Sequence, residues 1–84
     1  SFFYMVHSIM DKQYHWRKDS KYYKLTLQPN LFGTTDVICH WGRYGTNRGG
    51  YKIIACKDQQ EIDNVIQLIT KRRQIRGYLL NNHD

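Results

Sequence analysis

Apolar and polar residues alternate between positions 21 and 28 of the chain. Tyr23, Leu25 and Leu27 fall on one side of an extended backbone, and the residues between them are polar. A period of two is typical of a strand that buries one face. We therefore predict a half-buried strand over this segment.

The segment that follows, residues 29–33, is predicted to be a turn. Pro29 cannot donate a ladder hydrogen bond, and Gly33 readily takes a positive φ. We expect the apolar side chains of Leu31 and Phe32 to fold back under the sheet.

An extended pattern resumes over residues 35–45, although neither face of it is purely polar. One face carries Val37, Cys39, Trp41 and Arg43. A bulge near Gly42 would re-aim the side chains that come after it. The loop 46–50 then closes a hairpin onto a strand over residues 51–56, which leaves Arg48 at an exposed tip.

A helix is predicted to begin after Asp58, with Glu61 as its capping-box partner, and to end at Gly77. Its apolar stripe consists of Ile62, Val65, Ile66 and Ile69. Continued at the same period, the stripe reaches Arg73 and Arg76 instead of further apolar residues. We therefore expect the last turns to overshoot the core and to project their guanidinium groups past the sheet edge.

The N-terminal quarter of the chain is less regular. Residues 2–9 are apolar and β-prone, which fits either a first strand or an unstructured lead-in. Residues 11–20 mix charges with Tyr14 and Trp16, and this composition predicts a loop whose rings lie over the sheet. For Trp16 we favour burial as a hydrophobic lid over a stacking role.

Composition limits the class of protein. The chain has 84 residues, enough for one domain with one modest core, and 40% of them are apolar. Thirteen Lys and Arg against seven Asp and Glu give a net charge of +6, which favours acidic partners such as nucleic acid. No apolar run reaches the length of a membrane span, so we expect a soluble, cytoplasmic protein without a membrane partner.

The cysteines and histidines do not form a recognisable chemical site. Cys39 and Cys56 are expected to be reduced and buried, because neighbours on one strand, such as Cys39 and His40, point to opposite faces and cannot readily share an ion. We predict no metal and no cofactor. No nucleophile has an evident base, and no nucleotide-binding glycine motif is present, so we predict neither an enzyme nor a small-molecule substrate.

The stretch from Cys39 to Gly50 is the most unusual in the chain, because four of its twelve residues are glycine. Two rings and two guanidinium groups lie among these glycines, at Trp41, Arg43, Tyr44 and Arg48. No acidic residue occurs anywhere from position 37 to 56. Rings and cations in this combination suit a phosphate backbone and an exposed base.

The order Trp41, Gly42, Arg43, followed by Tyr44 and Gly45, resembles the signature of the WGR domain family. Further landmarks of that family are similar to residues 21–27, 28–33 and 76–78 of this chain. The resemblance implies an α+β fold, a small antiparallel β-sheet with one long helix packed on it. It also implies a single domain with its core at about 7–78 and flanking tails at 1–6 and 79–84.

The family occurs in poly(ADP-ribose) polymerases, where it helps to bind DNA ends, and in short bacterial proteins that this chain resembles. We therefore predict a module that binds nucleic acid, with DNA favoured, at ends, nicks or unpaired bases. The predicted site residues are Trp41, Gly42, Arg43, Tyr44, Arg48, Lys52, Arg72, Arg73 and Arg76. Trp41 would stack and the arginines would contact phosphates.

Two alternatives stay open. The basic helix end could only complement the helix dipole and maintain solubility, since the same charges serve either purpose. The whole module could instead mediate contacts between proteins or domains, with Trp41 and Arg43 in structural roles.

Overall fold

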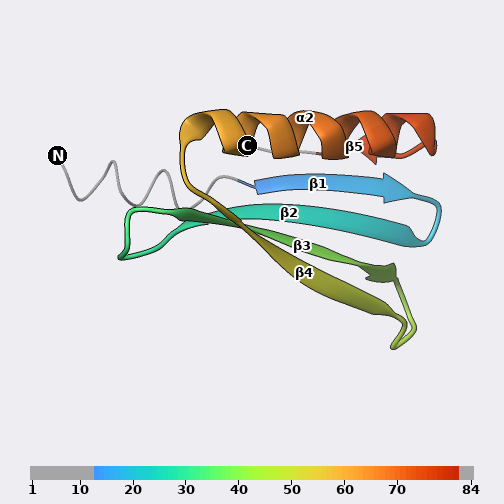
Figure 1. Cartoon of the computed structure of the whole chain (residues 1–84). Helices are drawn as coiled ribbons and strands as arrows, with labels where there is room; N and C mark the ends of the chain where they lie inside the picture. The colour runs from blue at the N-terminus through green and yellow to red at the C-terminus, as the bar shows by residue number, and fades with distance from the viewer. Residues whose placement is uncertain (1–12, 82–84) are drawn as a thin grey trace, which may run out of the picture.

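The computed structural model describes residues 13–81, which form an antiparallel sheet covered on one face by a long helix (Figure 1). In chain order the elements are β1 (Gln13–Lys18), β2 (Lys21–Pro29), β3 (Thr35–Arg43), β4 (Gly49–Cys56), α2 (Gln59–Ile75) and β5 (Leu79–Leu80). The strands lie in the order β4-β3-β2-β1-β5. This is the α+β architecture that the sequence predicts.

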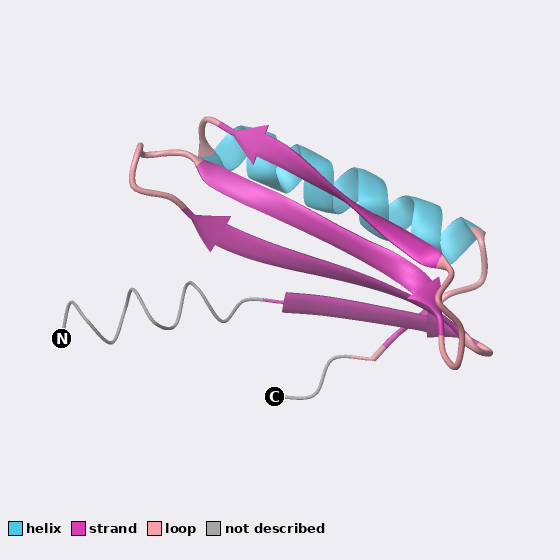
Figure 2. Ribbon diagram, turned by 90° about the horizontal axis from the view of Figure 1, so that it is seen from below, coloured by secondary structure: helices cyan, strands magenta, loops and turns pink. Residues whose placement is uncertain are grey.

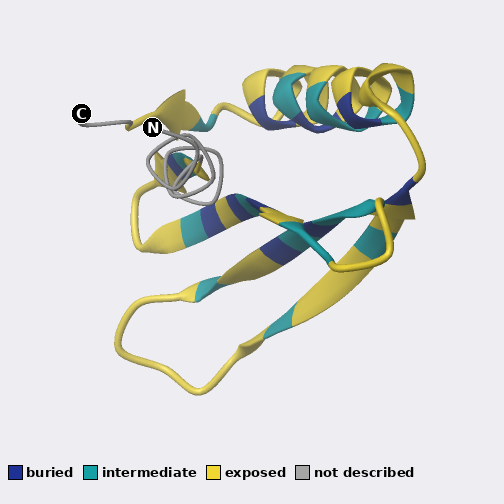
Figure 3. Cartoon of the chain, turned by 90° about the vertical axis from the view of Figure 1, so that its left-hand side faces the viewer, coloured by how far each residue is buried: buried dark blue, intermediate teal, exposed yellow. Residues whose placement is uncertain are grey.

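The helix lies on one side of the sheet only, and the opposite face is open (Figure 2). The core fills the space between α2 and the covered face, where the buried positions of strands and helix meet (Figure 3). Its buried members are Trp16, Tyr23, Leu25, Leu27, Val37, Cys39, Cys56, Ile62 and Ile69. The alternation predicted for β2 is therefore correct, because its three inward residues all belong to this core.

The bulge expected near Gly42 is absent. Pairing is continuous there, with Tyr22 opposite Gly42 on one side and Gly49 opposite Gly42 on the other. A Cβ at Gly42 would lie 2.7 Å from the Tyr22 hydroxyl oxygen, so the glycine makes room for the neighbouring ring and the strand stays regular.

Residues 13–18 form a strand, and the loop predicted for residues 11–20 is wrong over this part. His15 and Arg17 lie on the open face and alternate with the inward Trp16, whereas Lys18 donates a hydrogen bond to the Arg76 carbonyl at the helix end. Trp16 is 1% exposed, so its predicted burial is confirmed. The other N-terminal prediction, for residues 2–9, lies outside the described residues.

Two residues of the predicted C-terminal tail belong to the sheet. Leu79 and Leu80 pair with Arg17 and Trp16 of β1 and form the short strand β5. The backbone turns back toward the sheet at Gly77, which has a φ of 85°.

The turn between β2 and β3 does not fold its apolar side chains inward. Leu31 is fully exposed and Phe32 is 90% exposed, so the prediction for these two residues is wrong. The turn is held by polar contacts instead. The Asn30 Oδ1 atom accepts hydrogen bonds from the backbone N–H groups of Phe32 and Thr34.

Both helix ends match their predicted caps. The Asp58 carboxylate accepts a hydrogen bond from the Glu61 N–H at 2.9 Å, and Glu61 accepts one from the N–H of Lys57, just before the cap. At the other end the N–H of Tyr78 bonds the carbonyl of Arg73, and Gly77 bonds that of Gln74. This is the Schellman pattern.

Both cysteines are buried free thiols, as expected. Cys39 lies opposite Lys52 and Cys56 lies opposite Thr35, so the two do not face each other across the hairpin. Burial, together with the nearby carboxylates of Glu61, Asp58 and Asp36, raises the pKa of the Cys56 thiol. Between residues 13 and 81, no helix is long and apolar enough to span a membrane.

Candidate nucleic-acid interface

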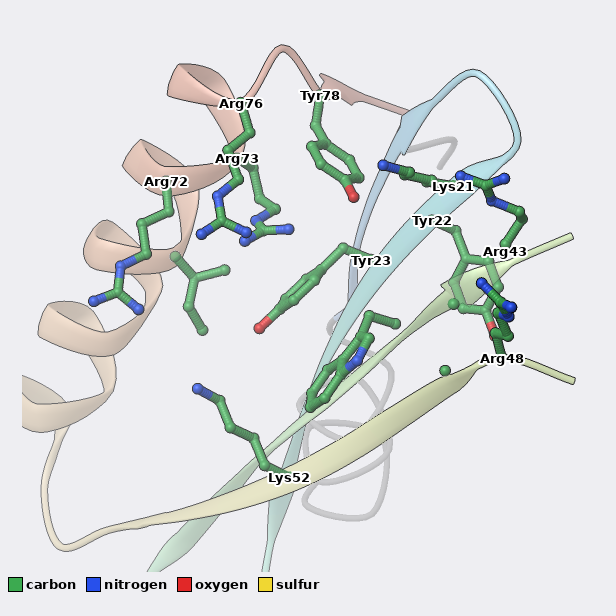
Figure 4. A pocket seen from close by; sticks show the side chains of 14 residues that line it. Lys21, Tyr22, Tyr23, Arg43, Arg48, Lys52, Arg72, Arg73, Arg76 and Tyr78 are labelled. Carbon is green, nitrogen blue, oxygen red and sulfur yellow. The ribbon is translucent and has the colours of Figure 1, made fainter.

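A cleft of about 510 Å³ opens between the C-terminal half of α2 and the ends of β2, β3 and β4 (Figure 4). It exists because the sheet twists away from the helix on the β3–β4 side (Figure 3). The lining residues are Lys21, Tyr22, Tyr23, Trp41, Gly42, Arg43, Arg48, Gly49, Lys52, Ile69, Arg72, Arg73, Arg76 and Tyr78. The cleft thus gathers every predicted site residue except Tyr44.

Trp41 lies on the floor of the cleft in a partly covered position. Its ring stacks on that of Tyr23, with centroids 6.0 Å apart and planes 14° apart. Gly50 is its partner on β4, and a Cβ there would lie 3.0 Å from the indole. The glycine therefore lets the indole lie flat across β4. Trp41 remains 36% exposed, so it is neither a core ring nor a free one.

Arg73 forms the inner end of the cleft and is only 8% exposed. Its guanidinium carbon lies 4.1 Å from the centroid of the Tyr23 ring and 4.8 Å from that of Tyr78. The expected projection past the sheet edge is therefore wrong for this residue. The reason is the turn at Gly77, which brings Tyr78 back against the guanidinium group.

The Arg73 side chain is held by rings instead of acids. Its buried Nε atom has no hydrogen-bond partner among the described residues. Burial and a hydrogen bond with Cys39 raise the pKa of Tyr23 to about 12, although Arg73 acts in the opposite direction. Tyr23 therefore stays neutral at physiological pH and contributes no countercharge. The positive charge of Arg73 stays uncompensated by these neighbours.

The other cations stand on two sides of the cleft. Arg72 and Arg76 extend from α2, and Lys52 points toward them from β4 (Figure 4). Lys21 and Arg43 are direct partners at the ends of β2 and β3. Like charges opposite each other destabilise a strand pair, which an anion between them would relieve.

The charge of the cleft is one-sided. Seven of the thirteen Lys and Arg residues of the chain line it, and no described carboxylate does. Within the described part of the chain, His, Cys, Asp and Glu residues nowhere gather in a group that could hold a metal ion. The arrangement suits a polyanion with a flat ring, and it offers no group placed for bond cleavage.

Tyr44 lies outside the cleft, on the open face of the sheet. Its ring centroid is 5.0 Å from that of Tyr22, and its hydroxyl group is 3.2 Å from His15 Nε2. The stretch from Cys39 to Gly50, which suggested a single site, therefore contributes residues to both faces of the sheet.

Sequence reasoning missed several residues that complete the cleft. Lys21 was detectable, because counting by twos puts it on the same face as Tyr23. Gly50 would have needed the β3–β4 register, which alone reveals that it faces Trp41. The position of Tyr78 against Arg73 had no local signal beyond the predicted helix end.

Comparison with known proteins gives one match. The sequence model of the WGR domain family matches residues 7–83, and the chain therefore belongs to that family. No curated protein and no solved structure matches the chain.

Proposed function

We propose that this WGR domain protein binds DNA in the cleft between α2 and the β3–β4 end of the sheet. Membership of the family is consistent with a small nucleic-acid-binding module. The observation that carries the proposal is the gathering of seven cations and a partly exposed tryptophan in one cleft without a described carboxylate. The proposed role is non-enzymatic.

In this proposal the two sides of the cleft contact phosphates and its floor contacts a base. Arg72 and Arg76 on the helix side, with Lys52 and Arg43 on the sheet side, would contact the phosphates of a backbone that enters the cleft. One side of the Trp41 ring already stacks on Tyr23, so the exposed part of the indole is available to a terminal or unpaired base. A base inside an intact duplex does not offer its flat face, so ends, nicks and gaps are the favoured DNA sites.

The salt dependence of binding tests the electrostatic part. Four or five neutralised phosphates give a log–log slope of the association constant against salt of roughly −3 to −5. The measurement is fluorescence anisotropy on blunt, nicked and single-stranded oligonucleotides over a salt series. A complete lack of binding at low salt would refute the proposal.

Two adjacent helix residues provide a matched pair of variants. Arg72 lines the cleft, whereas Lys71 belongs to the same turn of α2 but faces away from it. Arg72→Ala should make the salt slope shallower by about one, because one phosphate contact is lost. Lys71→Ala removes the same net charge and should leave the slope nearly unchanged. Equal effects would indicate attraction by net charge alone.

The stacking role is tested with Trp41→Ala, which should weaken binding to a blunt or nicked duplex by about tenfold. Arg43→Ala serves as comparison, since it should reduce the salt slope by about one. A folded Trp41→Ala protein that binds DNA as tightly as the parent would favour the alternative, a module for protein contacts.

A further inference from the structure

The helix α2 leaves one face of the sheet open (Figure 2). This face carries several exposed rings. Tyr51 is 65% exposed and Tyr44 is 42% exposed, and His40 beside them is also exposed. Aromatic side chains of this size are more often turned inward, as Trp16 and Tyr23 are on the covered face. The open face therefore differs from an ordinary solvated sheet surface.

One group of these rings is organised around Tyr44. Its ring lies 5.0 Å from that of Tyr22, and the Arg17 guanidinium carbon lies 4.9 Å from its centroid. Its hydroxyl group contacts His15 at 3.2 Å. Contacts on several sides fix the orientation of the ring, although 42% of the residue stays exposed.

A second group lies one cross-strand row away. His40 and Tyr51 are direct partners on β3 and β4, with ring centroids 5.7 Å apart. Lys24 follows in the same row, with its ammonium nitrogen 5.5 Å from the Tyr22 ring. The cation thus lies between the two groups of rings.

The charge of this area is positive. The two rows contain Arg17 and Lys24 and no described carboxylate. Asp36 lies at the far end of this face, opposite Gln28 and Ala55, and Asp19 lies in the β1–β2 turn, where its carbonyl oxygen accepts a hydrogen bond from Arg17. Burial, followed by the charges of Lys24 and Arg17, lowers the pKa of His15. The area therefore favours an anion.

We propose that this open face is a second binding surface, which adjoins the cleft at Tyr22, and that its ligand is single-stranded nucleic acid. Two adjacent ring groups can each accept a base by stacking, and Lys24 and Arg17 can contact the phosphates between them. Exposed rings on a sheet can stack on the flat faces of bases. In a duplex these faces are covered by the neighbouring base pairs. A segment of acidic residues would satisfy the cations but has no aromatic bases to stack on the rings.

The experiment uses a short labelled oligothymidine and a blunt duplex, each titrated in low salt against the parent protein and four alanine variants. Tyr51→Ala and Tyr44→Ala should each weaken oligothymidine binding by roughly tenfold and leave duplex binding nearly unchanged. Trp41→Ala in the cleft should show the larger loss with the duplex. Phe32→Ala is the control, because this ring is 90% exposed but belongs to the β2–β3 turn, and it should change neither.

A second measurement follows His15 in the parent protein by NMR. Phosphates bound beside Lys24 and Arg17 should raise the pKa of His15, whereas duplex bound only in the cleft should leave it unaltered. Unchanged oligothymidine affinity in both tyrosine variants would overturn the proposal. It would also be overturned if a polyglutamate peptide bound with the same dependence on Tyr51, since the surface would then select acidic protein.

Discussion

The two halves of the space between α2 and the sheet are built from the same elements but from different chemistry. In the half near the start of the helix, Leu25, Val37, Cys39 and Cys56 are at most 1% exposed. In the other half, Trp41 is 36% exposed and the helix stripe continues with Arg73. The half near the start of the helix is a close-packed core, and in the other half an open cleft lined by rings and cations lies beside the buried Trp16.

The difference shows how so small a domain can keep a site open without losing its fold. Burial of apolar side chains supplies most of the stability, and here it comes from the packed half and from Trp16 and Tyr23 on the β1 side of the other half. The cleft half is then free to hold uncompensated positive charge, which stabilises no fold but attracts a polyanion. Variants in the two halves should therefore differ in which property they change.

The largest loss of stability is expected from Leu25→Ala. Leu25 is completely buried, so its truncation removes apolar contacts and leaves a cavity, which should lower the free energy of unfolding by about 3 kcal/mol. Urea denaturation followed by circular dichroism measures this. Leu68→Ala on the exposed side of α2 is the control and should change stability by less than about 0.5 kcal/mol.

A smaller loss is expected from Trp41→Ala. The ring is partly exposed and one of its sides contacts Tyr23, so the free energy of unfolding should fall by about 2 kcal/mol. The variant should still melt cooperatively. A decrease in the free energy of unfolding as large as that of Leu25→Ala would show that Trp41 is a core residue. It would contradict the proposed difference between the two halves.

High pH should lower the free energy of unfolding through Tyr23, which lies between the packed half and the cleft. Tyr23 has a pKa of about 12 in the folded protein, above the ordinary value of 10.0. Because the unfolded chain releases this proton first, stability is fully present below pH 10 and falls as the pH rises toward 12. Thermal melting of the parent at pH 8 and pH 11 measures the decline. Tyr23→Phe should show a shallower one, and equal declines would contradict the assignment to Tyr23.

The smallest change in stability is expected from Arg73→Met. Methionine keeps most of the volume and removes a buried charge, while the contacts of the cation with two rings are lost at about 1 kcal/mol. These effects oppose each other, so the melting temperature should stay close to that of the parent. Duplex affinity should nevertheless fall by about fivefold, because the cleft loses a positive charge in a poorly solvated place. Strong unfolding of this variant would show that the guanidinium group is structural.

The packed half was largely predictable from the sequence. The alternation through Leu25 and Leu27 and the helix stripe from Ile62 to Ile69 are periodic patterns, and each marks a buried face without knowledge of the partner. The caps at Asp58 and Gly77 are equally local signals. The strand containing Trp16 escaped prediction because its outward charges concealed a short alternation.

The cleft was predictable only in part. A glycine-rich segment with rings and cations indicates a binding surface, and counting by twos places Trp41 and Tyr44 on opposite faces. The residues of other strands that complete each face depend on strand pairing. The burial of Arg73 depends on where the chain runs after the helix, which no periodicity encodes. The features of the cleft that the sequence did not predict therefore depend mainly on how the strands pair and on how the chain turns back after α2.

The short strand β5 has a consequence for local unfolding. It is held by two residue pairs and by a backbone hydrogen bond from Asn81 to His15, and Tyr78, which covers Arg73, directly precedes it. Detachment of this segment would uncover the edge of β1 beside Trp16 and would also move Tyr78 away from Arg73, which would keep its contact with the Tyr23 ring. Such a short, exposed strand opens at far lower free energy than the core strands. A ligand that fixes Arg73 should therefore slow amide hydrogen exchange in β5, even though it touches neither Leu79 nor Leu80.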